Sequence, residues 1–263
     1  LIAFEAGDLD WYSASTSNYD DLKANAAYKT ELVAANHITY FVMNPESNEV
    51  LANDLVREAI AYATDKEAMN YAAFDGYAAI AYYMEYPNYN VGAPSGGVTV
   101  SYDPDHAREL LAEAGYPDGC DIGKITCFTG SHFEKCAQVL QENLAAVGIT
   151  AELEWVDQTT NTTRGRAMEY EVLVSGSSCT GDYDNIRTRF HADYAGTKMI
   201  SLETWNNGKF LDSYNEMVAL IDQASQTLDP DARVALDQQL SDLLIQTYTL
   251  IPLLHKAQLY VWN

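Results

Sequence analysis

The chain has 263 residues, 48% of them hydrophobic, so it can bury a sizeable core as one large domain or two small ones. Fifteen lysines and arginines stand against 38 aspartates and glutamates, which gives a formal net charge of −23. Because such a surface repels phosphate backbones and anionic lipids, we expect no nucleic-acid partner and no peripheral attachment of the protein surface to a membrane. The charge would attract a cationic ligand, although solubility outside the cell explains it equally well.

No apolar run approaches the ~20 residues that span a bilayer. The chain starts Leu1-Ile2-Ala3-Phe4, without a Met or a charged and then apolar leader, so we expect a mature product or an excised piece.

The first part of the chain alternates strands and helices. The apolar run 38–43 (ITYFVM) predicts a buried strand. Two helical segments follow within 53–76, the first capped by Asn53 and the second by a capping box of Thr64 and Glu67. Residues 86–99 are rich in Pro and Gly and predict a loop.

Residues 103–120 (DPDHARELLAEAGYPDGC) mark both ends of a helix. Asp103 can cap the free amides, and Pro104 suits the first helical position. At the other end Gly115 can take the left-handed closing conformation, and Pro117 forbids continuation.

The second part begins with a strand–helix–strand unit at 124–130, 131–148 and 149–156, which implies two parallel strands joined by a right-handed crossover. Next come a strand at 170–176 (YEVLVSG), two long helices at about 210–227 and 230–247, and a closing strand at 250–262. The fold class is therefore α/β.

The sequence carries no motif of an enzyme active site. It has no Gly-rich phosphate loop, no G-x-S-x-G elbow and no metalloprotease helix. The Asp-Pro-Asp triplets at 103–105 and 229–231 stand where helices need caps, and no histidine has a Ser or Cys at a suggestive spacing. We therefore expect a protein that is not an enzyme, although a triad can assemble from distant positions.

The cysteines do not define a metal site; they are Cys120, Cys127, Cys136 and Cys179. His132 lies four residues before Cys136 on a predicted helix, but the chain has no C-x-x-C or H-x-x-x-H pair. We expect no metal and no cofactor, and we expect Cys136 to point into the core. The spacing leaves disulfides open.

One polar segment follows the strand predicted at 170–176. The residues SSCTGDYDN place Asp182 and Asp184 just past the carboxyl end of this strand. Ligands of open α/β sheets bind outside that end, and a carboxylate there is a natural partner for an ammonium group. An Asx-type turn that leaves the strand explains the same residue types, so both interpretations stay open.

Five segments, in order along the chain, resemble those of one family. The segments are 4–12 (FEAGDLDWY), 53–69 (NDLVREAIAYATDKEAM), 102–119 (YDPDHARELLAEAGYPDG), 139–157 (VLQENLAAVGITAELEWVD) and 229–253 (DPDARVALDQQLSDLLIQTYTLIPL). They resemble the extracellular solute-binding proteins of peptide ABC importers, the dipeptide- and oligopeptide-binding proteins of bacterial family 5.

The resemblance implies a periplasmic-binding-protein-like lobe, whose mixed, mostly parallel sheet is flanked by helices. Members of that family are about twice as long, so residues 1–35 are expected to be the tail of an N-terminal lobe with the crossover. Residues 36–263 are expected to be the C-terminal α/β ligand-binding lobe.

The implied function is capture of short peptides by closure of two lobes and delivery to ABC permease subunits in the membrane. We expect a monomer in the periplasm or outside the cell, anchored as a cell-surface lipoprotein when full length.

The resemblance also assigns a binding segment. The family carries an Asp after this strand that pairs with the α-ammonium of the peptide, and Asp182 takes that position. The expected ligand-binding residues are Ser178, Cys179, Thr180, Gly181, Asp182 and Asp184. Cys179 stands where the family often has Trp, so a nickel chelate, an oligosaccharide or an opine stays an alternative ligand. A secreted hydrolase and a sensory receptor lobe are the alternative functions.

Overall fold

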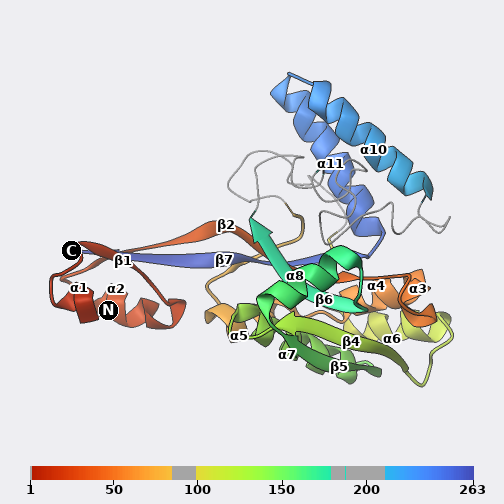
Figure 1. The fold of residues 1–263 in the computed structure, drawn as a ribbon, viewed down its shortest axis with the longest axis horizontal. Helices are drawn as coiled ribbons and strands as arrows, with labels where there is room; N and C mark the ends of the chain where they lie inside the picture. Colours follow the sequence, from red (N-terminus) through yellow and green to blue (C-terminus); the bar gives the residue numbers. More distant parts are fainter. Residues whose placement is uncertain (1, 85–98, 179–186, 188–210) are drawn as a thin grey trace.

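A curled, mixed sheet connects two unequal parts of the protein (Figure 1). The computed structural model describes residues 2–84, 99–178, 187 and 211–263. The strands lie in the order β1-β7-β2-β6-β4-β5, and β3 pairs with β7. Their bounds are β1 Trp11–Ala14, β2 Lys29–Met43, β3 Ala79–Ile80, β4 Cys120–Phe128, β5 Ile149–Val156, β6 Val172–Ser178 and β7 Leu250–Trp262.

The predicted mixed α/β class is confirmed, but the expectation of a mostly parallel sheet is wrong. In the described part of the chain, four strand pairings are antiparallel and two are parallel. The β4–β5 pair is parallel, as the crossover through a helix requires. The error arises because the long strands β2 and β7 pair directly with each other, and β6 runs against β2.

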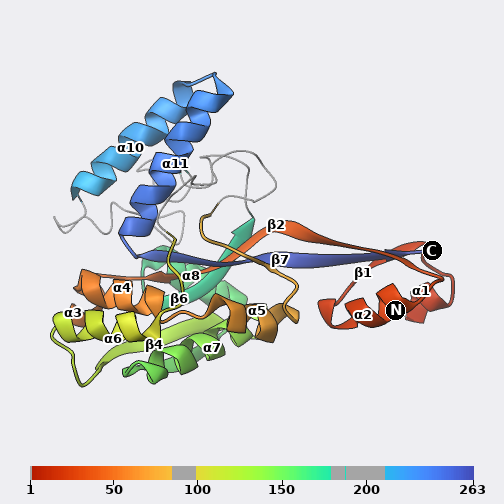
Figure 2. The same cartoon turned by 180° about the vertical axis from the view of Figure 1, so that it is seen from behind.

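Helices cover both faces of the sheet (Figures 1 and 2). Helices α4 to α7 pack on one face, and the hairpin of α10 and α11 packs on the other. The bounds are α1 Ile2–Glu5, η1 Thr16–Asn18, α2 Tyr19–Ala24, α3 Glu49–Ala52, α4 Asp54–Tyr62, α5 Lys66–Phe74, α6 Pro104–Glu113, α7 His132–Ala146, α8 Gln158–Ala167, α10 Leu211–Gln226 and α11 Pro230–Gln246. Within the described ranges, every helix is too short or too polar to cross a membrane.

The alternation of side chains along β2 creates these two layers. Phe41 and Met43 lie in the core beneath α4 to α7, whereas Tyr40 and Val42 lie in the core beneath α10 and α11. All four side chains are at least 97% buried, since none is more than 3% exposed. Successive strand residues point to opposite faces, so a strand that is apolar at every position belongs in the middle of three layers.

The predicted helix ends are largely confirmed. The Asp103 carboxylate accepts from the backbone N–H of His106, and Asn53 and Asp229 cap α4 and α11 in the same way. Gly115 has φ +95°, as the end of α6 requires.

The predicted cap of α5 is wrong by one residue. Asp65 is the N-cap and accepts from the N–H of Ala68 at 2.9 Å. Thr64 instead donates from Oγ1 to the carbonyl of Ile60 in the preceding helix. The Asp65 carboxylate caps a helix as well as a threonine hydroxyl does. Because the link between α4 and α5 is short, the Thr64 hydroxyl remains within reach of the last turn of α4 and bonds there.

Helices α1 and α2, strand β1 and the paired outer parts of β2 and β7 form an arm that extends from the main body and carries both chain ends (Figure 1). Its own core consists of four buried side chains: Phe4, Leu22, Leu259 and Val261. The register of β2 against β7 shifts between Ala34 and Ile38, where the arm joins the body. The division into residues 1–35 and 36–263 falls at this shift and stays a prediction.

Candidate ligand-binding site

The carboxyl ends of parallel strands meet at one edge of the sheet. β4 pairs in parallel with both β5 and β6, so Phe128, Val156 and Ser178 end their strands in the same direction. Helix α7 begins shortly after β4, and its N-cap Ser131 accepts from the N–H of Phe133 at 3.3 Å. The amino end of a helix and the ends of three strands thus define the edge where ligands of open α/β sheets bind.

Of the predicted ligand-binding residues, Ser178 falls within the described ranges. It is exposed, ends β6 and lies opposite His37 of β2. The other five lie outside the described residues, so their role stays a prediction: Cys179, Thr180, Gly181, Asp182 and Asp184.

Gly176 allows two aromatic rings to approach the end of β6 closely. A Cβ built at this position would lie 2.6 Å from Cε1 and Cζ of Phe133 and 2.7 Å from Cε1 of His37. Non-bonded carbon atoms pack at ~3.5–4.0 Å, so any side chain here would displace the rings or the strand. The rings come from α7 and β2, so two neighbouring elements occupy the space that a side chain at this residue would need.

Two histidines lie together beside this glycine. The ring centroids of His37 and His132 are 5.9 Å apart, and Nε2 of His132 lies 3.0 Å from Oγ1 of Thr39, which pairs with Gly176. Burial lowers the pKa of His132 to about 3, and the charges of His37 and Lys256 act in the same direction. Burial and the Lys256 charge also lower the pKa of His37.

Both imidazoles are therefore neutral near neutral pH, and the two rings themselves offer hydrogen bonds and apolar contact rather than positive charge. The sequence suggests no role for either histidine taken alone, so the pair was not predicted. The pair depends on the register of β2 against β6 and on the packing of α7, which the residue pattern does not encode.

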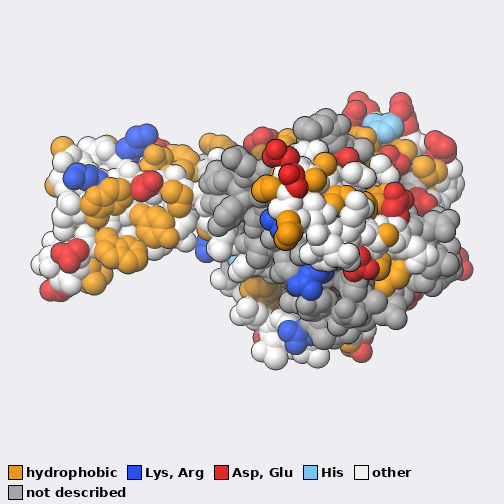
Figure 3. Space-filling model, turned by 90° about the horizontal axis from the view of Figure 1, so that it is seen from above, with side chains coloured by type: hydrophobic (Ala, Val, Ile, Leu, Met, Phe, Trp, Pro, Cys, Tyr) orange, Lys and Arg blue, Asp and Glu red, His pale blue; other side chains and the backbone are white. Residues whose placement is uncertain are grey.

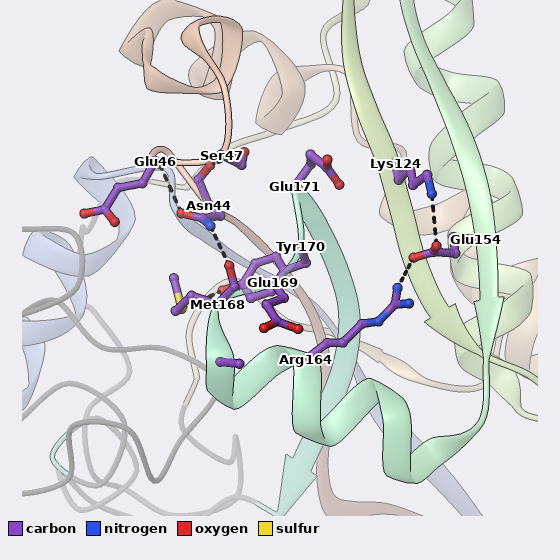
Figure 4. A pocket seen from close by; sticks show the side chains of 11 residues that line it. Asn44, Glu46, Ser47, Lys124, Glu154, Arg164, Met168, Glu169, Tyr170 and Glu171 are labelled. Atoms are coloured by element: carbon purple, nitrogen blue, oxygen red, sulfur yellow. Dashed lines mark hydrogen bonds and ion pairs between the residues drawn. The ribbon is translucent and has the colours of Figure 1, made fainter.

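A polar pocket of about 630 Å³ lies near the opposite end of β6 (Figure 4). Nζ of Lys124 lies 3.0 Å from Oε1 of Glu154, while Arg164 and the Thr126 hydroxyl contact the other oxygen. Burial would raise the pKa of Glu154, but these hydrogen bonds and charges outweigh it and lower that pKa. Both cations are thus paired with one carboxylate, and the network attaches α8 to the sheet. The pocket is lined by Asn44, Glu46, Ser47, Lys124, Glu154, Arg164, Ala167, Met168, Glu169, Tyr170 and Glu171.

The thiols in the described ranges are structural. Cys120, Cys127 and Cys136 are free, and burial raises the pKa of Cys120 to about 11 and of the other two to about 12. Protonated thiols are poor nucleophiles and poor metal ligands. Cys136 is fully buried in the core, as predicted. Among the described residues, no group of three or more His, Cys, Asp or Glu could hold a metal ion.

Sequence comparison finds relatives along most of the chain. The sequence profile described as "Bacterial extracellular solute-binding proteins, family 5 Middle" matches residues 1–199. The glutathione-binding protein GsiB of Salmonella paratyphi A is 30% identical over 239 residues, which cover 85% of this chain and 43% of GsiB. The chain thus spans less than half the length of this relative.

Solved structures share the fold throughout. AppA from Clostridium difficile has a TM-score of 0.85 at 19% identity, covering 100% of this chain and 53% of AppA. DppA from Helicobacter pylori, in complex with the peptide STSA, has a TM-score of 0.80 at 20% identity, covering 99% of this chain and 50% of DppA. The profile match extends over most of the sequence, and this chain belongs to the bacterial extracellular solute-binding proteins of family 5.

Proposed function

We propose that this chain is the C-terminal lobe of a two-lobed solute-binding protein that captures short peptides outside the cytoplasm and delivers them to ABC permease subunits. The observation that carries the proposal is the family match together with the fold. The match to DppA, whose structure holds a peptide, covers 99% of this chain and 50% of DppA. Glutathione, the ligand named for GsiB, is also a small peptide.

The ligand segment proposed for this lobe follows β6. Ser178 lies at the ligand edge of the sheet, and the chain continues from it through Asp182 and Asp184. We infer that Asp182 binds the α-ammonium group of the peptide, with Cys179, Thr180 and Gly181 beside it. The net charge of −23 favours this polarity.

We also propose that the protein changes no covalent bond in its ligand. The buried thiols and the neutral histidines at the edge supply no activated nucleophile, and the family consists of binding proteins. We propose further that the full-length protein is a monomer and is anchored to the cell surface as a lipoprotein.

The arm supports a second lobe as the remaining wall of the binding cleft. Leu259 and Val261 of β7 point into the small arm core, so the alternate residues Tyr260 and Trp262 lie on the other face of the strand. With Asp10 and Trp11 they line an apolar hollow of about 520 Å³, and Trp11 is 60% exposed. Figure 3 shows apolar side chains gathered on the arm.

We propose that this aromatic face is covered by the N-terminal lobe of the longer polypeptide. The relatives are more than twice as long as the segment they share with this chain, and both ends of the chain lie on the arm. Trp11→Ser should therefore destabilise the full-length protein more than residues 1–263 alone, in which the ring of Trp11 packs only against Tyr260, at a centroid separation of 5.9 Å, among the described aromatic rings. A matched change at the solvent-exposed Leu228 should affect neither. Equal effects of Trp11→Ser on both would contradict this assignment.

The test of the function is recovery of the ligand. Full-length protein is incubated with a mixture of short peptides that includes glutathione and STSA, washed, denatured, and analysed by mass spectrometry. We expect bound peptides of unchanged mass and no products in the supernatant. Peptide fragments would indicate a hydrolase, and retention of an opine, oligosaccharide or metal chelate in place of peptides would overturn the ligand class.

A further inference from the structure

A small pocket lies at the amino end of helix α5. It is lined by the first turn of that helix, by the end of β3 and by residues 100–102. Its volume is about 90 Å³, which holds about three water molecules at ~30 Å³ each, or one ion of a few non-hydrogen atoms. Tyr82 and Tyr102 line the pocket and are 38% and 45% exposed, so its rim is open to solvent.

Lys66 places a buried ammonium group in the wall of this pocket. The residue is 8% exposed, and its Nζ donates to the carbonyl of Ala81 at 2.9 Å and lies 4.9 Å from the ring centroid of Tyr82. An ammonium group has three hydrogens to donate, and this carbonyl is the one acceptor that the described chain offers. Two of the three hydrogens are therefore available to a molecule in the pocket.

The positive charge of Lys66 has no counter-charge in the described chain. Asp65 and Glu67 line the same pocket, but neither forms an ion pair with it there. The Asp65 carboxylate accepts from the backbone N–H of Ala68 at 2.9 Å, and Glu67 is exposed. Burial lowers the pKa of Lys66 to about 7. Because an unpaired buried charge is costly, an anion beside this group would be stabilised.

The end of α5 is a second, independent source of positive potential at the pocket. The helix spans Lys66–Phe74, and its cap Asp65 satisfies the N–H of Ala68. Among the described residues, the N–H groups of Lys66 and Glu67 have no acceptor. Free N–H groups and the helix dipole make the amino end of a helix favourable for an anion.

We propose that this pocket binds one small monovalent anion, either chloride or a carboxylate of one or two carbons, through the ammonium group of Lys66 and the amino end of α5. The volume of the pocket sets the limit on size. Because the net charge of −23 repels anions, we expect an affinity in the millimolar range. The inference goes beyond the proposed function and does not rest on it.

The test is urea unfolding of the full-length protein at about pH 6 and constant ionic strength, with chloride or formate replacing gluconate, which is too large for the pocket. A bound anion stabilises the folded state in a saturable way, so at ten times its dissociation constant it should lower the unfolding equilibrium constant about elevenfold. The response to chloride compared with that to formate identifies the ion. If neither ion stabilises wild type relative to gluconate, the pocket holds water and the proposal is wrong.

Two lysine variants separate this site from general salt effects. Lys66→Met keeps an unbranched stem but removes the charge, so it should abolish the stabilisation by the anion. Lys124→Met is the matched control, because Nζ of Lys124 already pairs with Glu154 at 3.0 Å, and this variant should respond as wild type does. The same anion response in Lys66→Met as in wild type would overturn the proposal.

The pH dependence in wild type tests the site without any variant. Anion binding requires the protonated ammonium group, so with a pKa of about 7 for Lys66 the dissociation constant should rise about tenfold from pH 6 to pH 8. The other titratable groups that line the pocket are the carboxyls of Asp65 and Glu67 and the phenols of Tyr82 and Tyr102. These classes ordinarily titrate near ~4 and ~10, outside that range. A dissociation constant that does not change with pH would contradict the role of Lys66.

Discussion

His37 and His132 lie with their rings nearly perpendicular, at an interplanar angle of 82° and a centroid separation of 5.9 Å. Burial lowers the pKa of both, in His132 to about 3. A histidine in an unfolded chain titrates near ~6.5, so below that pH the unfolded state binds more protons than the folded state. The free energy of unfolding should therefore decrease as the pH falls from ~6.5 towards ~3.

Replacement of His132 tests this origin of acid sensitivity. Gln can keep a hydrogen bond to Thr39 but does not titrate, so His132→Gln should cost about 1–2 kcal/mol near neutral pH. The gap to wild type should close by about pH 5, because only wild type must exclude a proton at position 132 there. Urea unfolding of wild type and His132→Gln, near pH 7 and at about pH 5, measures this difference in unfolding free energy. His106→Gln, at an exposed site beside Glu109, is the control. A gap that does not change with pH would refute this explanation.

Arg57 connects three segments from a completely buried position. Its Nη1 donates to the carbonyl of Leu51 at 2.7 Å, its Nε donates to the carbonyl of Thr247 at 3.2 Å, and Asp54 pairs with the remaining nitrogen. Arg57→Met would leave these acceptors without their donor and should cost about 3–5 kcal/mol of unfolding free energy. Denaturant titration should show that Arg108→Met loses less than about 1 kcal/mol of unfolding free energy, because its ion pair with Asp105 is exposed. Equal losses in the two variants would contradict the claim that burial makes Arg57 costly to replace.

Gly119 and Gly115 form a matched pair for backbone packing. Both have positive φ, at +94° and +95°, but a Cβ on Gly119 would lie 2.2 Å from the carbonyl oxygen of Gly148, whereas Gly115 has nothing within 4 Å. Gly115→Ala should cost about 1 kcal/mol from conformation alone. Gly119→Ala should cost about 3 kcal/mol or more, because it also separates β4 from β5. Similar melting temperatures for the two variants would contradict the close approach.

Much of the fold can be predicted from the sequence, because helix ends and turns are determined by residues close together in the chain. The cap at Asp103, the positive φ at Gly115 and the crossover from β4 to β5 each depend on residues close together in the chain. The mixed sheet was predicted correctly, but not the predominance of antiparallel pairs, because the pairing of β2 with β7 joins opposite ends of the chain and leaves no local pattern.

The candidate site divides in the same way. An acidic segment after an apolar strand can be recognised from its residues, which is how Asp182 was predicted; it lies outside the described residues and stays a prediction. The contacts of His37 and Phe133 with Gly176 cannot, because they depend on where α7 packs and on the register of β2 against β6. Only the structure shows why residue 176 is a glycine: the rings of Phe133 and His37 leave no room for a side chain, and its φ is not positive.

The Asp182 carboxylate should carry the recognition of a free amine. Asp182→Asn in the full-length protein should weaken binding of STSA by about 2–5 kcal/mol, because the ligand ammonium is left buried and unpaired. Asp184→Asn should cost less, and neither change should alter the melting temperature. Calorimetry with STSA and its N-acetylated form provides the readout. Equal affinity of wild type for the two peptides, or a larger loss in Asp184→Asn, would make this assignment wrong.

The central claim is that this chain supplies one wall of a two-walled peptide site. A small ligand needs most of its surface covered to bind usefully, so both lobes must contribute. The most direct measurement is the dissociation constant of STSA for the full-length protein and for residues 1–263 alone, under identical conditions. We predict measurable binding by the full-length protein and binding weaker by about 100-fold or more by residues 1–263. Equally tight binding by residues 1–263 alone would contradict the claim.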